Sequence, residues 1–173
     1  MIRKSTKRIE TERLVLRPFR DSDAQKMFDN WASDPEVTKF LTWPTHASVD
    51  VTRAIIGTWI PLIETECNWC IALKESDEPI GSIAVVNVED DVPEIGYCIS
   101  RKHWGQGVTP EAAKAVIDYL MHECGAKRVI AKHDVNNPNS GKVMMKAGMH
   151  FTGTKEAENN TGRCTVKVYA IDR

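Results

Sequence analysis

In the stretch Lys102-His103-Trp104-Gly105-Gln106-Gly107-Val108-Thr109-Pro110-Glu111-Ala112, two glycines one residue apart follow a strand-like run. They precede a helix that we expect to start at Thr109 or Pro110. Glycine allows the backbone to curl so that successive N–H groups point at one anion, and the positive end of the helix dipole strengthens this attraction. The stretch therefore predicts a phosphate-binding turn and a cofactor that contains a diphosphate.

Composition limits the class of protein. The chain has 173 residues, 42% hydrophobic and 27% charged, which is typical of one globular domain spanning residues 1–173. A formal net charge of -1 gives no general attraction to nucleic acid. No apolar run approaches the roughly 18 residues of a membrane-spanning helix, and the first residues do not form a secretion signal. We therefore expect a cytoplasmic protein.

The five cysteines, at positions 67, 70, 98, 124 and 164, are an odd number. Cys67 and Cys70 form a Cys-x-x-Cys pattern in a strand-like run, where side chains three residues apart point to opposite faces. No second pair of cysteines or histidines completes a zinc site. We therefore expect reduced thiols and no bound metal.

Hydrophobic periodicity predicts an α/β domain with a mixed sheet. Apolar runs bounded by turn residues indicate strands, and apolar stripes at helical spacing indicate helices. The expected strands span residues 13–19, 68–73, 80–88, 94–100, 128–135, 149–154 and 165–171. The expected helices span residues 21–31, 48–60, 110–124 and 137–147.

This order of elements and the glycine loop resemble the GNAT N-acetyltransferases, in which an Arg/Gln-x-x-Gly-x-Gly/Ala loop binds the pyrophosphate of acetyl-CoA. The further matches are Asn137-x-x-Ser140 before Lys146-Ala147-Gly148-Met149, Glu94-Ile95-Gly96-Tyr97, and Thr11-Glu12-Arg13-Leu14-Val15-Leu16-Arg17-Pro18-Phe19 with Asp34-Pro35-Glu36-Val37. The last match resembles the opening of the RimJ/RimL-like subgroup, which acetylates the N-termini of ribosomal proteins. The resemblance spans residues 9–172. It implies a mixed, mostly antiparallel central sheet, splayed in the middle and flanked by four helices.

Two positions depart from the family pattern. Lys102 stands where the loop usually carries Arg or Gln, so it offers a phosphate a point charge without the bidentate fork of arginine. Met149 replaces the usual Phe after Gly148, which changes packing only.

The resemblance implies acetyl-CoA as the cofactor. In the family, the sheet splays after the strand that carries Glu94, and the backbone there bonds the pantetheine amides as an added strand would. His103 and Trp104 either flank the phosphates or simply cover the loop. The cofactor-binding residues implied are Cys98, Ile99, Ser100, Lys102, His103, Trp104, Gly105, Gln106, Gly107, Val108, Thr109, Asn137, Asn139 and Ser140.

Glu94 is the candidate general base. Strand alternation places it on one face with Gly96, which leaves room for substrate, and with Cys98. Glutamates that act as the base in the family lie on this strand. The alternative is an exposed carboxylate at the strand end, beside Asp90 and Asp91.

Ser140 is the candidate residue for hydrogen-bonding or protonating the departing CoA thiolate. Many family members use a tyrosine seven residues after the motif asparagine, where this chain has Met144. The subgroup commonly lacks that tyrosine, and the serine at the helix start reaches the sulfur instead. The alternative is that Ser140 caps or packs the first helical turn. Asn137 either orients the pantetheine arm or caps the same helix.

Trp43 and His46 lie in a loop that forms a wall of the substrate site in relatives, so Trp43, His46 and Glu94 are the candidate substrate-binding residues. The alternative is that this aromatic loop fills the core. His133, a lone histidine on a strand, is expected to be structural rather than a base. Acceptor selectivity is expected to lie in the 41–50 loop and in the hairpin near 155–163.

The expected function is direct transfer of acetyl from acetyl-CoA to a primary amine, at a protein N-terminus in this subgroup, without a ping-pong step through Cys98. A terminal α-amine is roughly one tenth neutral at pH 7, whereas a lysine amine is neutral at about the 10⁻³ to 10⁻⁴ level. One alternative is a small-molecule acetyltransferase for a polyamine, amino acid or antibiotic. Another is a CoA-binding module without catalysis. We expect a monomer or homodimer without a nucleic-acid or membrane partner.

Overall fold

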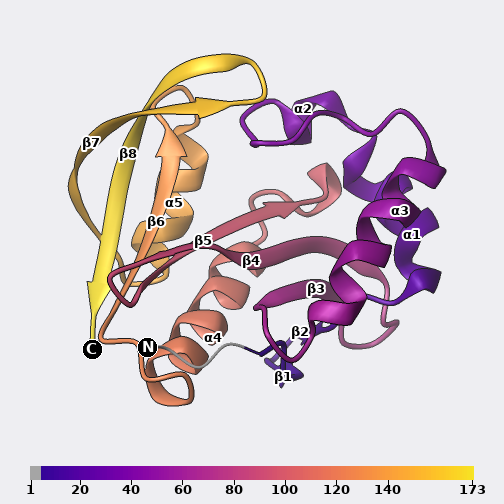
Figure 1. Ribbon diagram of the computed structural model, residues 1–173, viewed down its shortest axis with the longest axis horizontal. Coiled ribbons are helices and arrows are strands. Elements are labelled where there is room, and N and C mark those ends of the chain that lie inside the picture. The colour runs from indigo at the N-terminus through magenta and orange to yellow at the C-terminus, as the bar shows by residue number, and fades with distance from the viewer. Residues whose placement is uncertain (1–4) are drawn as a thin grey trace.

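The computed structural model describes residues 5–173, and the described residues form one eight-stranded sheet (Figure 1). The strand order is β1-β2-β3-β4-β5-β6-β8-β7, and every neighbouring pair is antiparallel except β5 and β6. The sheet is therefore mixed and mostly antiparallel, which confirms the prediction. The strands are β1 (Ile9–Glu10), β2 (Leu14–Arg17), β3 (Asn68–Leu73), β4 (Pro79–Glu89), β5 (Val92–Ile99), β6 (Arg128–Asp134), β7 (His150–Asn159) and β8 (Gly162–Asp172).

The helices follow the expected order, and short helical turns are added at Arg101–His103 and at α2. Helix α2 is a single turn that begins at Pro35, where the sequence predicted only a break; the Asp34 carboxylate accepts the Glu36 N–H at 3.0 Å. Helix α4 begins at Val108, earlier than expected, because Gly107 takes a φ of 76° and serves as its N-cap. The helices are α1 (Ala24–Met27), α2 (Pro35–Thr38), α3 (Val49–Trp59), α4 (Val108–His122) and α5 (Pro138–Lys146). Helix α1 is preceded by a tighter 3-10 turn at Asp21–Asp23 and followed by a wider π-helical turn at Phe28–Ala32.

Two hairpins are longer than the sequence indicated. The pairing of β4 with β5 continues to a two-residue turn at Asp90 and Asp91, whose φ angles are 51° and 62°. Aspartate tolerates this left-handed conformation better than most residues. The pairing of β7 with β8 also continues to a two-residue turn, at Asn160 and Thr161. Most residues of these strand ends are polar and exposed or half-buried, so no alternating apolar pattern marks them as strands.

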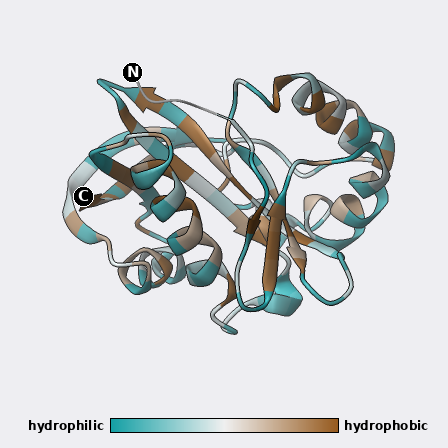
Figure 2. Cartoon of the chain, turned by 90° about the horizontal axis from the view of Figure 1, so that it is seen from below, coloured by the Kyte–Doolittle hydropathy of each residue, from teal (hydrophilic) through white to brown (hydrophobic). Residues whose placement is uncertain are grey.

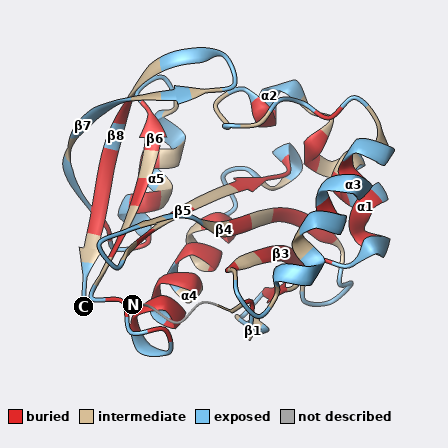
Figure 3. Ribbon diagram, viewed as in Figure 1, coloured by how far each residue is buried: buried red, intermediate tan, exposed pale blue. Residues whose placement is uncertain are grey.

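The core consists of two apolar clusters, one on each face of the sheet. Ile71 and Ile95 pack with helix α4, whereas Cys70 and Cys98 pack with the helical segments that precede β3. Both faces of β3 are therefore covered, which explains its continuous apolar run. Cys67 belongs to the first cluster and Cys70 to the second, so the two thiols do not converge. Figure 2 shows hydrophobic residues along the strands, and Figure 3 shows buried residues on strands such as β4, β6 and β8 and on helix α4.

The parallel pair β5 and β6 holds together at one end only. It pairs at two positions, Glu94 with Ile130 and Ile95 with Ala131. Beyond this point the two strands diverge, as Figure 1 shows for β5 and β6. The predicted splay is thus confirmed, and it opens a gap in the middle of the sheet directly after Ile95.

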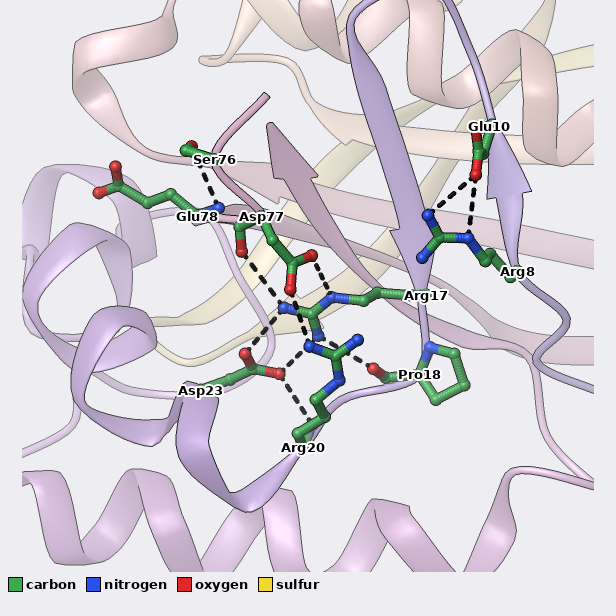
Figure 4. Close-up of polar contacts among 9 residues, drawn as sticks. All are labelled: Arg8, Glu10, Arg17, Pro18, Arg20, Asp23, Ser76, Asp77 and Glu78. Atoms are coloured by element: carbon green, nitrogen blue, oxygen red, sulfur yellow. Dashed lines mark hydrogen bonds and ion pairs between the residues drawn. The ribbon is translucent and has the colours of Figure 1, made fainter. Parts of the chain in front are cut away.

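A buried arginine ties strand β2 to two turns (Figure 4). Arg17 is 2% exposed; it donates to both carboxylate oxygens of Asp23 at 2.8 and 2.9 Å and to Asp77 at 2.8 Å. Burial alone would lower the pKa of the Arg17 guanidinium, but these two carboxylates hold it above its ordinary value. Arg20 also donates to Asp77 at 2.7 Å. The cluster thereby fixes the turn before α1 and the turn between β3 and β4 against β2.

Candidate active site

A cavity of about 1220 Å³ reaches both faces of the sheet at the gap between β5 and β6. Thr109 and Ser140 line it from helices α4 and α5 on one face. Phe19 and Trp43 line it from the segments that cover the other face. The volume exceeds that of most single-ligand pockets. The cavity can therefore admit two molecules that meet inside the sheet, one from each face.

The glycine loop lies at the N-terminus of α4, as predicted. Gly105 and Gly107 line the cavity with φ angles of 72° and 76°, a conformation that side chains rarely adopt. No atom lies within 4 Å of a Cβ built on Gly105, so the loop surface is open there. The backbone N–H groups of the first turn of α4 have no partner within the helix, and the helix dipole favours an anion. This arrangement suits a pyrophosphate.

An arginine in the turn between β1 and β2 holds the glycine loop in place. Arg13 donates through Nη1 to the Gln106 carbonyl at 2.9 Å and through Nε to Glu111 at 2.7 Å. The Thr11 hydroxyl donates to the same carboxylate at 2.6 Å. Burial would raise the pKa of Glu111, but the hydrogen bonds from Thr11 and Arg13 hold it below its ordinary value. The sequence motifs contain Thr11, Arg13 and Glu111 but do not predict their contact, which joins segments about 100 residues apart.

The remaining predicted cofactor residues divide between the cavity wall and its support. Cys98, Ile99, His103, Trp104, Asn137 and Asn139 line the cavity. The residues that do not line it are Ser100, Lys102, Gln106 and Val108. The Ser100 N–H donates to the Ile80 carbonyl at 2.7 Å, and the Trp104 indole donates to the Ile99 carbonyl at 3.0 Å. Part of the backbone that was expected to be free for pantetheine therefore already has a partner.

Glu94 lies at the point where β5 and β6 separate, and it lines the cavity. Lys132 of β6 donates to Glu94 Oε2 at 2.6 Å; the Glu94 side chain is 14% exposed and the Lys132 side chain 26%. The alternative of a freely solvated strand-end carboxylate is therefore wrong. Lys132 was not among the predicted site residues. It lies on β6 two residues after Ile130, the strand partner of Glu94, and this position was the signal that could have indicated the contact.

Ser140 lies in the first turn of α5, where a tyrosine of β5 contacts it. Tyr97 donates to the Ser140 carbonyl at 2.9 Å, and its hydroxyl is 3.1 Å from Ser140 Oγ. Asn137 occupies the N-cap position of α5 but makes no capping hydrogen bond through its side chain. Its amide thus stays available to the cavity. The sequence patterns place Tyr97 at the end of the Glu94-Ile95-Gly96-Tyr97 match, on the strand face opposite Glu94, and predict no role for it.

The two predicted substrate residues of the aromatic loop separate. Trp43 lines the cavity, whereas His46 is buried and does not. His46 Nδ1 lies 2.7 Å from the Thr52 hydroxyl, its ring packs on Trp43 with centroids 5.0 Å apart, and burial lowers its pKa. The structure thus places His46 as a support for Trp43. His133 is also buried but lines the cavity; its Nδ1 lies 2.8 Å from the Asp134 carbonyl, and its Nε2 has no hydrogen-bond partner among the described residues.

The two segments expected to set selectivity meet at one side of the cavity. Asn160, at the tip of the β7–β8 hairpin, donates through its backbone to the Leu41 carbonyl at 3.0 Å. Its side-chain amide donates to the Thr38 carbonyl at 2.9 Å. Figure 1 shows this hairpin tip reaching α2 across the splayed sheet. The hairpin and the α2 segment therefore close one side of the cavity mouth.

Comparisons with known proteins agree with this geometry. The acetyltransferase (GNAT) domain model matches residues 13–150, and the chain belongs to this family of N-acetyltransferases. It is 34% identical over 158 residues to the uncharacterized N-acetyltransferase p20 of Bacillus licheniformis, with 88% of each chain covered. It is 30% identical over 122 residues to the ribosomal-protein-serine acetyltransferase of Escherichia coli (strain K12), with 68% of each chain covered.

A solved structure of RimL, a ribosomal L7/L12 alpha-N-protein acetyltransferase in complex with coenzyme A, has the same fold. Its TM-score is 0.83 at 22% identity, over 96% of this chain and 98% of that chain. Within residues 5–173, no helix is long and apolar enough to cross a membrane.

Proposed function

We propose that this chain is a single acetyltransferase domain that transfers acetyl from acetyl-CoA to the α-amine of a protein N-terminus. The observation that carries the proposal is the cavity at the splay. It has the glycine loop and Ser140 on one face, and the carboxylate of Glu94 at the vertex. Membership of the GNAT family and the relation to ribosomal-protein acetyltransferases support the same reaction.

The residues present fit acetyl-CoA. Gly105 and Gly107 leave the N-terminus of α4 open to a pyrophosphate, and a side chain at either position would require a strained backbone. On the side of β5 that faces β6, no strand of residues 5–173 pairs with it beyond Ile95, so pantetheine amides would find backbone groups in the gap. When bound, acetyl-CoA supplies an acetyl thioester. The helix start and the gap would aim this thioester at Glu94.

The side chains at the gap suit acyl transfer to an amine. Lys132 holds one carboxylate oxygen of Glu94, and no described group donates to the other, so Oε1 can accept from the incoming amine. Glu94 would orient that amine and take up its proton, directly or through water. Ser140 would donate to the sulfur as the carbon–sulfur bond breaks. Glu94 would therefore take the proton from the amine, and Ser140 would donate to the departing sulfur, so the two steps use separate side chains.

A thiol intermediate does not fit this site. Cys98 lies in the gap strand, but its Sγ contacts the Ser82 hydroxyl at 3.2 Å, and burial raises its pKa to about 11. At pH 7 only about one molecule in ten thousand would carry the thiolate. We therefore expect no acetyl group on Cys98 when the protein is incubated with acetyl-CoA alone. Peptide mass spectrometry checks this, and an acetylated Cys98 peptide would indicate a ping-pong reaction.

An acceptor panel tests the proposed function. We expect acetyl-CoA turnover, followed as thiol release, with peptides that carry a free N-terminus, and none with the same peptides blocked there but containing lysine. The same assay is run with three small amines as acceptors: a polyamine, an amino acid and an amine-containing antibiotic. Turnover of small amines alone would contradict the ribosomal type of acceptor. Binding of acetyl-CoA without turnover on any amine would indicate a binding module.

A further inference from the structure

The hydroxyl of Tyr97 lies against Ser140, and the proposed reaction assigns no role to this contact. Tyr97 comes from the gap edge of β5, and Ser140 from the first turn of α5; both line the cavity. The Tyr97 hydroxyl is 2.9 Å from the Ser140 carbonyl oxygen and 3.1 Å from Ser140 Oγ. The Tyr97 phenol thus contacts both oxygens of Ser140, the residue proposed to donate to the sulfur of CoA.

The environment of Tyr97 makes it a hydrogen-bond donor rather than a source of protons. Burial raises the pKa of its phenol well above the ordinary value, and the hydrogen bond with Ser140 only partly opposes this shift. A tyrosine hydroxyl has one proton to donate, whereas a serine hydroxyl can accept one hydrogen bond while donating another. Tyr97 can therefore donate to Ser140 Oγ while the proton of Ser140 points elsewhere.

We propose that Tyr97 is a positioning residue for the departing thiolate, acting through Ser140. Its O–H turns from the Ser140 carbonyl to Ser140 Oγ, and this directs the serine proton to the sulfur. When the carbon–sulfur bond breaks, the electron pair stays on sulfur and is stabilised by the serine O–H, while Tyr97 keeps its own proton. Donation into Ser140 strengthens the second hydrogen bond, because linked hydrogen bonds polarise one another.

The proposal rests on the proposed function in two respects, the binding of CoA and the donation from Ser140 to its sulfur, but it needs no knowledge of the acceptor. Its test is the titration of the CoA thiol in the binary complex, followed by the ultraviolet absorbance of the thiolate. The proteins compared are the wild type, Tyr97→Phe, Ser140→Ala and the double variant. The matched control is Tyr119→Phe. Tyr119 is also a buried tyrosine that bonds a serine, Ser5, but it does not line the cavity.

We expect the thiol of CoA to titrate at lower pH in the wild-type complex than in free solution. Tyr97→Phe should raise its pKa by about one unit, a tenfold loss of thiolate at a given pH. Ser140→Ala should raise it at least as far, and the double variant no further than Ser140→Ala alone. Tyr119→Phe should match the wild type.

Three results would overturn the proposal. The first is a Tyr97→Phe complex that titrates like the wild type while Ser140→Ala does not. The second is a double variant whose shift is the sum of the two single shifts, since Tyr97 would then act independently of Ser140. The third needs no variant at all, and therefore holds even if Tyr97→Phe does not fold. It is a wild-type complex whose thiol titrates as in free CoA. Failure of the wild type to bind CoA would instead contradict the proposed function.

Discussion

Replacing Glu94 with glutamine should lower kcat/KM for the acceptor amine by about 10²- to 10⁴-fold, the range measured for loss of a general base. Glutamine keeps the shape of the side chain and can still accept from Lys132, but it cannot take up a proton. Acetyl-CoA binding should change little, because the glycine loop lies at the start of α4 and not at the vertex of the gap. Steady-state kinetics with a peptide acceptor and direct titration with acetyl-CoA measure the two effects.

Controls separate this role from a structural one. Glu89→Gln makes the same change at an exposed position near the end of the β4–β5 hairpin, outside the cavity wall, and should keep wild-type kinetics. Lys132→Met frees the Glu94 carboxylate to turn, so it should reduce kcat/KM, by about tenfold if one charge-assisted hydrogen bond is lost. It should have no further effect in the Glu94→Gln background. Unchanged activity of Glu94→Gln would mean that Glu94 serves only as the partner of Lys132.

Replacing Asp23 with alanine should remove about 3–5 kcal/mol from the free energy of unfolding, the usual loss when one partner of a buried ion pair is deleted. Arg17 would stay buried, with Asp77 as its remaining carboxylate, and Asp77 is 46% exposed at its side chain. The Arg20 N–H, which now donates to Asp23 at 2.8 Å, would also lose its acceptor. Urea unfolding followed by circular dichroism measures the change.

The matched control for this prediction is Asp21→Ala, two residues away in the same turn. Its side chain is 72% exposed, so we expect a change of no more than about 0.5 kcal/mol. A double variant, Arg17→Met with Asp23→Leu, should recover stability relative to Asp23→Ala, because it removes both charges from the core. A loss below about 1 kcal/mol for Asp23→Ala would show that the cluster in Figure 4 relaxes into water.

Much of the fold could be predicted because its signals are local. Alternation and apolar runs located the strands longer than four residues, and the positions of glycine, proline and serine located the helix ends. Ser48, for example, accepts the Val51 N–H at the start of α3. The errors also have local causes. The hairpin ends at Asp90–Asp91 and Asn160–Thr161 were missed because an exposed strand and a polar loop have the same composition.

The candidate site was predicted only in part. The glycine loop, Glu94 and Ser140 belong to short patterns, and the structure places all of them at one cavity. Lys132 belongs to no such pattern, and Tyr97 ends the Glu94-Ile95-Gly96-Tyr97 match without a predicted role, although Lys132 contacts Glu94 and Tyr97 contacts Ser140. Which side chains face each other across two strands depends on register, and a shift of one residue would turn Lys132 to the opposite face.

The sequence by itself determined the glycine turn before α4, most of the strands and helices in their order along the chain, and the family to which they belong. These follow from backbone freedom at glycine, from periodicity and from short motifs, all of which act over a few residues. The tertiary structure alone decided which partners complete them: Arg13 on the glycine loop, Lys132 on Glu94, Tyr97 on Ser140, and Asn160 on the α2 segment. Each of these contacts joins residues about 40 to 120 positions apart, and only the packing of the folded chain sets their distance.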